Sequence, residues 1–352
     1  MPGNLATLLL QKVIATIIVV SFEQICHIAI QLLVMEDKRD SNAAKRGAFL
    51  VFDGMTLPPF PPLKKNAEER FTAIRDLETR PDDIILTAFP RSGTHWLWEV
   101  IHMLLQGKAE YTTAVKETAF LESIPDLNPI NEVKSPRLLN THVPFRWLPK
   151  KHLCDDGKIV HVIRNPKDQA VSMYNFMLSF SPNKEMSAAK MSWNVFFEMT
   201  MKAPEKFFGG WFAYEKEFEK ASKDGTLKAV HTLYYEDLKM NPIKEIRLLA
   251  EFLSVDVKDE LVQAIADKCT FTKLKKADET LKTKVNADQA SHYRKGEVGD
   301  WKNYFTVSQN EQFDNLISKD SETVVSAKGY AAYYFIQTYD TQALCVREKW
   351  YV

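Results

Sequence analysis

The stretch Phe89-Pro90-Arg91-Ser92-Gly93-Thr94-His95-Trp96 decides the fold that the sequence predicts. An apolar, β-branched run at 84–88 precedes it and is typical of a buried parallel strand, and the apolar spacing at 97–105 indicates a helix after it. A strand, a tight turn and a helix N-terminus together form an anion site, because backbone N–H groups and the helix dipole point toward the bound charge.

Four residues of this turn would supply the contacts to an anion. Gly93 allows the backbone to approach a phosphate closely, and Arg91 supplies a fixed positive charge. Ser92 and Thr94 supply hydroxyl donors. The stretch lacks the full GxxxxGK[ST] pattern of a nucleotide P-loop, so these residues alone leave an ordinary strand-to-helix turn open.

The composition limits the remaining classes of protein. At 352 residues the chain has room for one large α/β domain or two small ones. Its 46 Lys and Arg balance its 46 Asp and Glu, so no overall field favours nucleic acid or an acidic membrane as a partner. The eight histidines form no HxxxH or comparable pattern, and we expect no metal site.

Cysteine spacing indicates a reducing compartment. The four cysteines fit no CxxC spacing and lie far apart in the chain, at Cys26, Cys154, Cys269 and Cys345. We interpret them as free thiols of a cytoplasmic protein, although sequence alone leaves a disulfide open.

The N-terminal residues 5–34 are rich in Leu, Ile and Val. Their longest uncharged core, residues 13–22, is about half the ~20 residues that a membrane-spanning helix needs. An additional amphipathic or buried helix is the favoured interpretation, and a membrane-associated or signal-anchor segment and a disordered extension remain alternatives. The charged residues 35–46 then form a linker.

Alternating strands and helices predict an α/β fold, a single domain with a central parallel sheet flanked by helices. A proline-rich segment at 57–62 is expected to be non-helical and to run over the surface, and a helix is expected at 67–78. Further strands are predicted at 137–142, 158–164 and 229–235, and further helices from about 167 and over 242–253. In such sheets ligands bind beyond the carboxyl ends of the strands.

Two more segments have the chemistry of phosphate ligands. Arg164 ends a predicted strand and Ser172 follows on a helix, so a guanidinium fork and a hydroxyl form a second clamp. The later loop at 293–302 contains Arg294, Lys295 and Gly296, which can close over a phosphate. Taken separately, each segment is explained as well by a surface ion pair or a solvated loop, but the three segments in this order are far more specific.

At this point the chain resembles the cytosolic sulfotransferase family, from about residue 49 to 319. Residues 89–96 are similar to the loop that holds the 5′-phosphosulfate of 3′-phosphoadenylyl sulfate (PAPS), and residues 164–172 to the segment that grips its 3′-phosphate. Residues 294–301 are similar to the closing loop of the family. The resemblance implies a P-loop-like phosphosulfate loop in a sulfotransferase domain at 48–320, between an N-terminal extension at 1–47 and a divergent tail at 321–352.

The resemblance also implies roles for single residues. His142, in Asn-Thr-His-Val-Pro, stands at the place of the catalytic base, and Arg91 would stabilise the leaving phosphate oxygen. Trp96 would stack on the adenine, and Tyr235 and Thr270 would contact the adenosine, with core packing as the alternative for all three. The implied PAPS-binding residues are Arg91, Ser92, Gly93, Thr94, His95, Trp96, Arg164, Ser172, Tyr235, Thr270, Arg294, Lys295 and Gly296.

The chain departs from the family pattern at three positions. Arg91 replaces the usual loop lysine, His95 a frequent threonine, and Asn140 the frequent lysine two places before the catalytic histidine. The last change removes a cation that would act in the transition state. A slow or narrow enzyme is therefore expected rather than an inactive one. Residues 271–272 read Phe-Thr where the family often has Ser-Phe, so the contact of that aromatic is shifted.

The predicted function is transfer of a sulfuryl group from PAPS to a hydroxyl or amine of a small apolar acceptor, namely a phenol, sterol, alcohol or amine. The aromatics expected at the acceptor pocket, for which core packing is the alternative, are Phe120, Phe145, Trp147, Tyr174 and Phe176. A PAPS-binding protein with weak or no catalysis remains an alternative, and an ATP-dependent kinase is a weaker one because no GK[ST] lysine is present.

The segment after the closing loop predicts a homodimer. Residues 302–311 match the K-x-x-x-T-V-x-x-x-E dimerisation pattern of the family through Lys302, Thr306, Val307 and Glu311. A cytoplasmic location is expected, with a membrane-anchored Golgi enzyme as the variant that membrane association of residues 5–34 would imply.

Overall fold

The computed structural model describes residues 50–112, 116–179, 192–202, 208–284 and 293–320. The predictions for the apolar N-terminal segment, for Cys26 and Cys345 and for the tail at 321–352 lie outside these residues. Cys154 and Cys269 are free thiols. In the described ranges no helix has both the length and the apolar character needed to cross a membrane.

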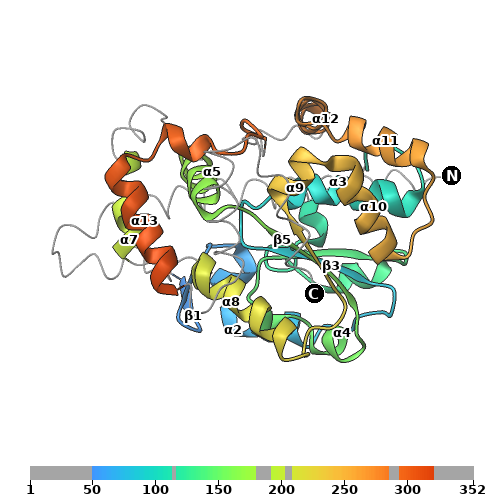
Figure 1. The fold of residues 1–352 in the computed structure, drawn as a ribbon. Helices are drawn as coiled ribbons and strands as arrows, with labels where there is room; N and C mark the ends of the chain where they lie inside the picture. The colour runs from blue at the N-terminus through green and yellow to red at the C-terminus, as the bar shows by residue number, and fades with distance from the viewer. Residues whose placement is uncertain (1–49, 113–115, 180–191, 203–207, 285–292, 321–352) are drawn as a thin grey trace.

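A four-stranded parallel sheet forms the centre of the fold (Figure 1). Its strands lie in the order β4-β3-β5-β6. In the register, Ile84 of β3 lies opposite Leu138 of β4 and Lys158 of β5. The strands are β3 (Ile84–Ala88), β4 (Leu138–Thr141), β5 (Lys158–Ile163) and β6 (Val230–Tyr234). All four strands predicted from apolar runs are confirmed, within one or two residues at each end.

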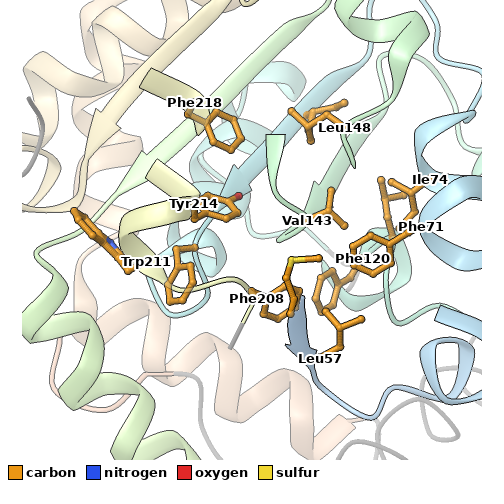
Figure 2. Packing of buried hydrophobic residues seen from close by; sticks show 14 of the residues in the cluster. Leu57, Phe71, Ile74, Phe120, Val143, Leu148, Phe208, Trp211, Tyr214 and Phe218 are labelled. Carbon is orange, nitrogen blue, oxygen red and sulfur yellow. The ribbon is translucent and has the colours of Figure 1, made fainter. Parts of the chain in front are cut away.

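Helices cover both faces of this sheet, which confirms the predicted α/β fold class. Side chains alternate along β3, so Ile85 packs in one apolar cluster with Phe71 and Phe218, whereas Leu86 packs in a second cluster with Leu97 and Leu249. The first face is covered by α2 (Pro61–Arg75) and α8 (Trp211–Lys223), and the second by α3 (Thr94–Gln106), α10 (Pro242–Leu253) and α11 (Asp259–Lys268). Figure 2 shows part of the first cluster.

The remaining helices surround these layers. In Figure 1, α5 (Pro166–Ser179), α7 (Trp193–Lys202) and α13 (Val307–Asp320) lie together at one end. Helix α12 (Phe271–Lys284) follows α11. The shorter elements are the antiparallel pair β1 (Leu50–Phe52) and β2 (Met55–Leu57), η2 (Lys116–Ala119), η3 (Asn128–Glu132), η4 (Phe145–Trp147), α4 (Lys150–Cys154), α9 (Tyr235–Met240) and η5 (Asp300–Asn303).

The prediction that the proline-rich segment is non-helical holds for residues 57–60 and is wrong for Pro61 and Pro62, and the expected surface course is wrong at two apolar residues. Pro61 and Pro62 begin α2, because the first residues of a helix need no N–H partner and a proline already has helical φ. Leu57 and Phe60 are buried in the core, at 3% and 4% exposure, rather than on the surface. Asn66 is non-helical (φ −163°) and divides α2 into two pieces, so the helix predicted from residue 67 is confirmed at its start, whereas it ends at Arg75 instead of 78.

Candidate active site

The anion loop lies at the carboxyl end of β3, where the turn has a conformation that favours glycine. Gly93 is the N-cap residue of α3 and has φ +108°. A Cβ atom at this position would lie 2.8 Å from Cδ2 of Tyr235. The ring of Tyr235 and the loop backbone are therefore in direct contact, and residue 93 has no space for a side chain.

Hydrogen bonds from α5 and the end of β5 hold the loop in place. Nη1 of Arg164 donates to the carbonyl oxygen of Arg91 at 3.0 Å, and Nε2 of Gln169 donates to that of Pro90 at 2.9 Å. Nε of Arg91 donates to Oγ of Ser172 at 3.4 Å. The structure thus brings together the loop and the second predicted clamp, which are far apart in the sequence.

Several donors at this place are buried without a protein acceptor. Oγ of Ser92, Nε of Arg164 and Nε1 of Trp96 have no hydrogen-bond partner among the residues that the structure describes. Buried donors of this kind are rare in folded proteins, so an external acceptor is their expected partner. A phosphate-bearing ligand fits these donors, because its oxygens are acceptors and the guanidinium carries a positive charge.

Two aromatic rings adjoin the same place. Trp96 and Tyr235 meet edge to face with centroids 5.5 Å apart, and the guanidinium of Arg164 lies 4.4 Å from the centroid of the Tyr235 ring. Thr270 is less well placed than the sequence predicts, because its exposed hydroxyl donates to the carbonyl oxygen of Asp267 at 3.0 Å. The neighbouring Phe271 instead packs on residues 293–302, which we call the basic loop. A Cβ atom at Gly296 of this loop would lie 2.1 Å from the Phe271 ring.

The basic loop is hydrogen-bonded to α5. Asp168 of α5 accepts hydrogen bonds from the backbone N–H groups of Gly299 and Trp301, at 2.7 and 2.9 Å. Sequence reasoning missed this residue; its place in the first turn of a predicted helix was the available signal. The contact brings the loop beside the helix that carries Ser172.

Asp300 pairs with both predicted cations of this loop. Its carboxylate accepts hydrogen bonds from Nη2 of Arg294 at 2.5 Å and from Nζ of Lys295 at 2.7 Å, and it is 3% exposed. Burial acts to raise the pKa of Asp300, but the hydrogen bonds from Lys295, Asn303 and Arg294 outweigh it and lower the pKa to about 2. Asp300 is a second residue that the sequence analysis did not single out.

His142 lies just beyond β4 with 8% exposure. Its Nδ1 lies 2.6 Å from the carbonyl oxygen of Ala88. A carbonyl oxygen accepts, so Nδ1 carries the proton and Nε2 has a free lone pair. Burial and the charges of Lys116 and Arg91 lower the pKa of His142 to about 3, against a smaller opposing effect of the Ala88 hydrogen bond. The imidazole is therefore neutral near pH 7 and can accept a proton at Nε2.

Glu122 fixes the backbone at this histidine. The N–H of His142 donates to Oε1 of Glu122, which is fully buried. Burial raises the pKa of Glu122 to about 7, opposed by the hydrogen bonds from His142 and Thr141 and by the charge of Lys116. The sequence analysis did not identify Glu122, because its role depends on a tertiary contact. The loop after η2, which carries Glu122, lies against the end of β4.

The predicted acceptor aromatics separate into two groups. Phe120 lies edge to face with His142 at 5.1 Å between ring centroids, and Phe176 lies 4.2 Å from the guanidinium of Arg91. Phe208, which the sequence analysis missed, lies 6.2 Å from the His142 ring, and Figure 2 shows it near Phe120. The others pack in aromatic clusters: Phe145 with Phe218, Trp147 with Phe71, and Tyr174 with Trp193.

The three departures in the sequence have different surroundings. Arg91 has a left-handed φ of +72°, and its side chain points to Ser172 and Phe176 as described above. Nε2 of His95 lies 3.7 Å from a carboxylate oxygen of Glu117. Asn140 is fully buried, and neither atom of its amide has a hydrogen-bond partner within the described ranges.

The segment predicted for dimerisation is on the surface. Lys302, Thr306, Val307 and Glu311 are all exposed, and Val307 is 76% exposed. Thr306 also has a structural role, because its N–H donates to Oε1 of Gln309 at 3.0 Å and its Oγ1 accepts from the Gln309 N–H at 3.2 Å. This reciprocal pair is a capping box at the start of α13.

Comparison with known proteins identifies relatives of this chain. The model of the sulfotransferase domain matches residues 81–324. Sulfotransferase 1A1 of Rattus norvegicus is 34% identical over 277 residues, which cover 73% of this chain and 91% of the relative. Sulfotransferase 1B1 of Canis lupus familiaris is 34% identical over 265 residues, which cover 70% of this chain and 86% of the relative.

Solved structures agree with this similarity. A crystal structure of mouse sulfotransferase SULT7A1 complexed with PAP superposes with a TM-score of 0.62 at 28% identity and covers 80% of this chain and 98% of that one. Retinol dehydratase in complex with androsterone and PAP has a TM-score of 0.60 at 19% identity, covers 74% of this chain and 87% of its own, and shares the fold.

Proposed function

Because this chain belongs to the sulfotransferase family, we propose that it transfers a sulfuryl group from PAPS to a hydroxyl or amine of a small apolar acceptor, with His142 as general base. The chain is a PAPS-dependent enzyme of this family, and its acceptor is a small molecule. The acceptor classes that we propose are phenols, sterols, alcohols and amines. The role of each residue and the absence of a metal requirement are likewise part of the proposal.

One observation supports the assignment most strongly. A neutral imidazole with a free Nε2 lies at the end of β4, beside the β3 loop whose buried donors lack a protein acceptor. The loop amides, Ser92 and Thr94 are suited to the 5′-phosphosulfate. Arg164, Ser172, Arg294 and Lys295 are suited to the 3′-phosphate. Tyr235 and Trp96 form the aromatic side of the nucleotide site.

The chemistry needs one proton transfer and one exchange of bonds at sulfur. Nε2 of His142 takes the proton of the acceptor hydroxyl while the acceptor oxygen forms a bond to sulfur. The bond between sulfur and the phosphate oxygen breaks, and its electron pair stays on that oxygen. Arg91 and the loop amides stabilise this charge. The proton on His142 then passes to solvent, and the imidazole returns to its neutral form.

A turnover experiment tests this function. Purified protein is incubated with PAPS labelled at sulfur and a panel of phenols, sterols, alcohols and amines, and labelled product is separated by chromatography. The proposal expects labelled product with at least one acceptor class and its loss in His142→Ala. Tight binding of adenosine 3′,5′-bisphosphate (PAP) without any transfer would instead support the alternative, a PAPS-binding protein with weak or no catalysis.

We also propose a homodimer that forms through Lys302, Thr306, Val307 and Glu311. In a two-fold contact each segment pairs with its own copy, so Lys302 can face Glu311 of the partner while Val307 packs near the axis. The exposed valine supports this, since an apolar side chain at 76% exposure gains by burial. A cytoplasmic location is proposed from the family, and fractionation of the full chain and of a variant lacking residues 1–46 tests it.

A further inference from the structure

Position 140 leaves the region around His142 without a cation from β4. Asn140 is fully buried, and its amide has no hydrogen-bond partner in the described part of the chain. It lies in β4 and precedes His142, just beyond the strand, by two residues. A neutral side chain here cannot stabilise negative charge that develops beside the histidine.

Lys116 reaches this region from another segment. It is the first residue of η2 and is only 5% exposed. Its Nζ lies 5.1 Å from the centroid of the Phe120 ring, and the same ring lies 5.1 Å from the ring of His142. Phe120 also forms an isolated parallel bridge with Asn140. The ring of Phe120 therefore lies between the lysine and His142, and the backbone of Phe120 pairs with Asn140 of β4.

The charge of Lys116 is not neutralised by a direct partner. Among the described residues it makes no ion pair and no hydrogen bond through Nζ, and the carboxylates of Glu117 and Glu122 act on it through longer-range charge. Burial lowers the pKa of Lys116 to about 8, with a further lowering by Arg91. Conversely, Lys116 lowers the pKa of His142, so its charge acts on the imidazole. Because Lys116 is only 5% exposed and the two carboxylates act at longer range, its charge is weakly screened and acts strongly on nearby groups.

We propose that Lys116 supplies the cation of the acceptor side, stabilising the negative charge on the transferring sulfuryl group in place of a charged residue at position 140. This inference rests on the proposed function. A positive charge held in a site from which water is excluded acts strongly on developing charge, because little solvent screens it. The lysine thus offsets one departure of this sequence from the pattern of its family.

Three variants test the charge directly. Turnover is measured with PAPS and the best acceptor of the wild-type screen, and the affinity for PAP is measured by calorimetry. Lys116→Met removes the charge but keeps a side chain of similar length. It should lower kcat on the order of 10²-fold and leave the affinity for PAP within about twofold of wild type. Lys116→Arg should retain most of the activity. Lys134→Met, at an exposed lysine, is the matched control and should turn over as wild type.

A charge restored at position 140 separates an electrostatic role from a structural one. Asn140→Lys in the Lys116→Met background should recover at least about tenfold in kcat, since the cation then comes from β4. In wild type, kcat should fall as the pH rises through about 8, where Lys116 loses its proton, and Lys116→Arg should abolish that fall. Thermal melting of each variant checks that the fold is retained.

The outcomes distinguish this inference from the function on which it rests. A wild type that binds PAP but transfers no sulfuryl group overturns both. An active wild type with a fully active Lys116→Met variant overturns the role of Lys116 and leaves the sulfotransferase assignment in place. The role of the charge is also overturned by a third outcome. In it Lys116→Met is folded but inactive, Asn140→Lys does not restore its kcat, and Lys116→Arg leaves the pH dependence of kcat unchanged.

Discussion

The ring of Tyr235 packs against Gly93 and occupies the space that a side chain at residue 93 would need. A Cβ atom at Gly93 would lie 2.8 Å from Cδ2 of the tyrosine, below the distance at which carbon atoms pack. The contact joins the loop after β3 to the start of α9 at the end of β6. It thereby sets how closely the Tyr235 ring approaches the loop after β3, and the two together form part of the nucleotide site that we propose.

Gly93→Ala should therefore lower the affinity for PAP by at least about tenfold, because the loop or the ring must move and the φ of +108° disfavours alanine. Gly107→Ala is the control. Gly107 also has a left-handed φ, +67°, but no atom lies within 4 Å of its Cβ position. We expect Gly107→Ala to lower the melting temperature slightly without changing PAP affinity. Calorimetry on both variants checks the prediction, and equal affinities would contradict it.

The nucleotide site should select for a 3′-phosphate. Charge-assisted hydrogen bonds contribute about 1.5–3 kcal/mol each, and ADP and ATP lack the phosphate that Arg164, Ser172 and the basic loop would bind. PAP should bind at least about 10²-fold more tightly than ADP. Ser172→Ala should narrow this ratio, whereas Ser308→Ala, at an exposed serine of α13, should not. Competitive calorimetry with the nucleotides measures the ratio, and a ratio near one excludes PAPS as the donor.

His142 should control turnover and not nucleotide binding. Removing a general base costs about 10²–10⁴-fold, so His142→Ala should lose kcat by this factor with PAP affinity within about twofold of wild type. Because the pKa of His142 is lowered to about 3, the profile of kcat/KM should stay flat down to about pH 5 instead of falling near 6.5. His231→Ala, at a partly buried histidine of β6, is the control. Full activity of His142→Ala would refute the mechanism.

Glu122 should make stability depend on pH in a direction unusual for a carboxyl group. Its folded pKa, raised to about 7 mainly by burial, exceeds the unfolded value of about 4.5. The folded state therefore binds the extra proton, and stability is lost as the pH rises from about 4.5 through 7. Glu122→Gln keeps a carbonyl acceptor for the His142 N–H but cannot ionise.

Glu122→Gln should consequently raise the melting temperature by a few °C at pH 8 and by much less at pH 5. Glu132→Gln, at an exposed position, should show no such difference. Calorimetric melting at the two pH values decides the matter. A gain for Glu122→Gln that is the same at both pH values would show that ionisation of Glu122 is not its cause.

The proposed dimer should be separable by a single charge. A contact of one ten-residue segment per protomer is well below the ~1,200–2,000 Å² of a standard interface. Val307→Glu places two like charges near the two-fold axis, and light scattering should then report a monomer that still binds PAP. Val133→Glu, at another exposed valine (48%), should remain dimeric. A wild-type monomer at tens of micromolar, or a dimeric Val307→Glu, would leave residues 302–311 with a structural role only.

Several features could be predicted from the sequence because they depend on neighbouring residues. Apolar β-branched runs predicted β3, β4, β5 and β6, since a strand buried on both faces has no polar side. The turn around Gly93 and the segment at Arg164 were predicted as anion ligands from residue type and spacing, and the family came from the resemblance of these segments to its motifs. The prediction failed at Pro61 and Pro62, because prolines can begin a helix as well as prevent one. The neighbouring Leu57 and Phe60 are buried in the core, which the local sequence does not specify.

By itself, then, the sequence determined the α/β class and the strand–turn–helix around Gly93, which lie in short contiguous segments, and its resemblance to the family implied His142 as the base that we propose. The tertiary structure decided which distant groups act on them: Asp300 pairs with Arg294 and Lys295, Glu122 accepts the N–H of His142, and the charge of Lys116 lowers the pKa of His142. The physical reason is that strand pairing and burial set distances and screening between residues far apart in the chain. The pKa of His142 and the charge of Lys116 depend on those distances, and no spacing in the sequence specifies them.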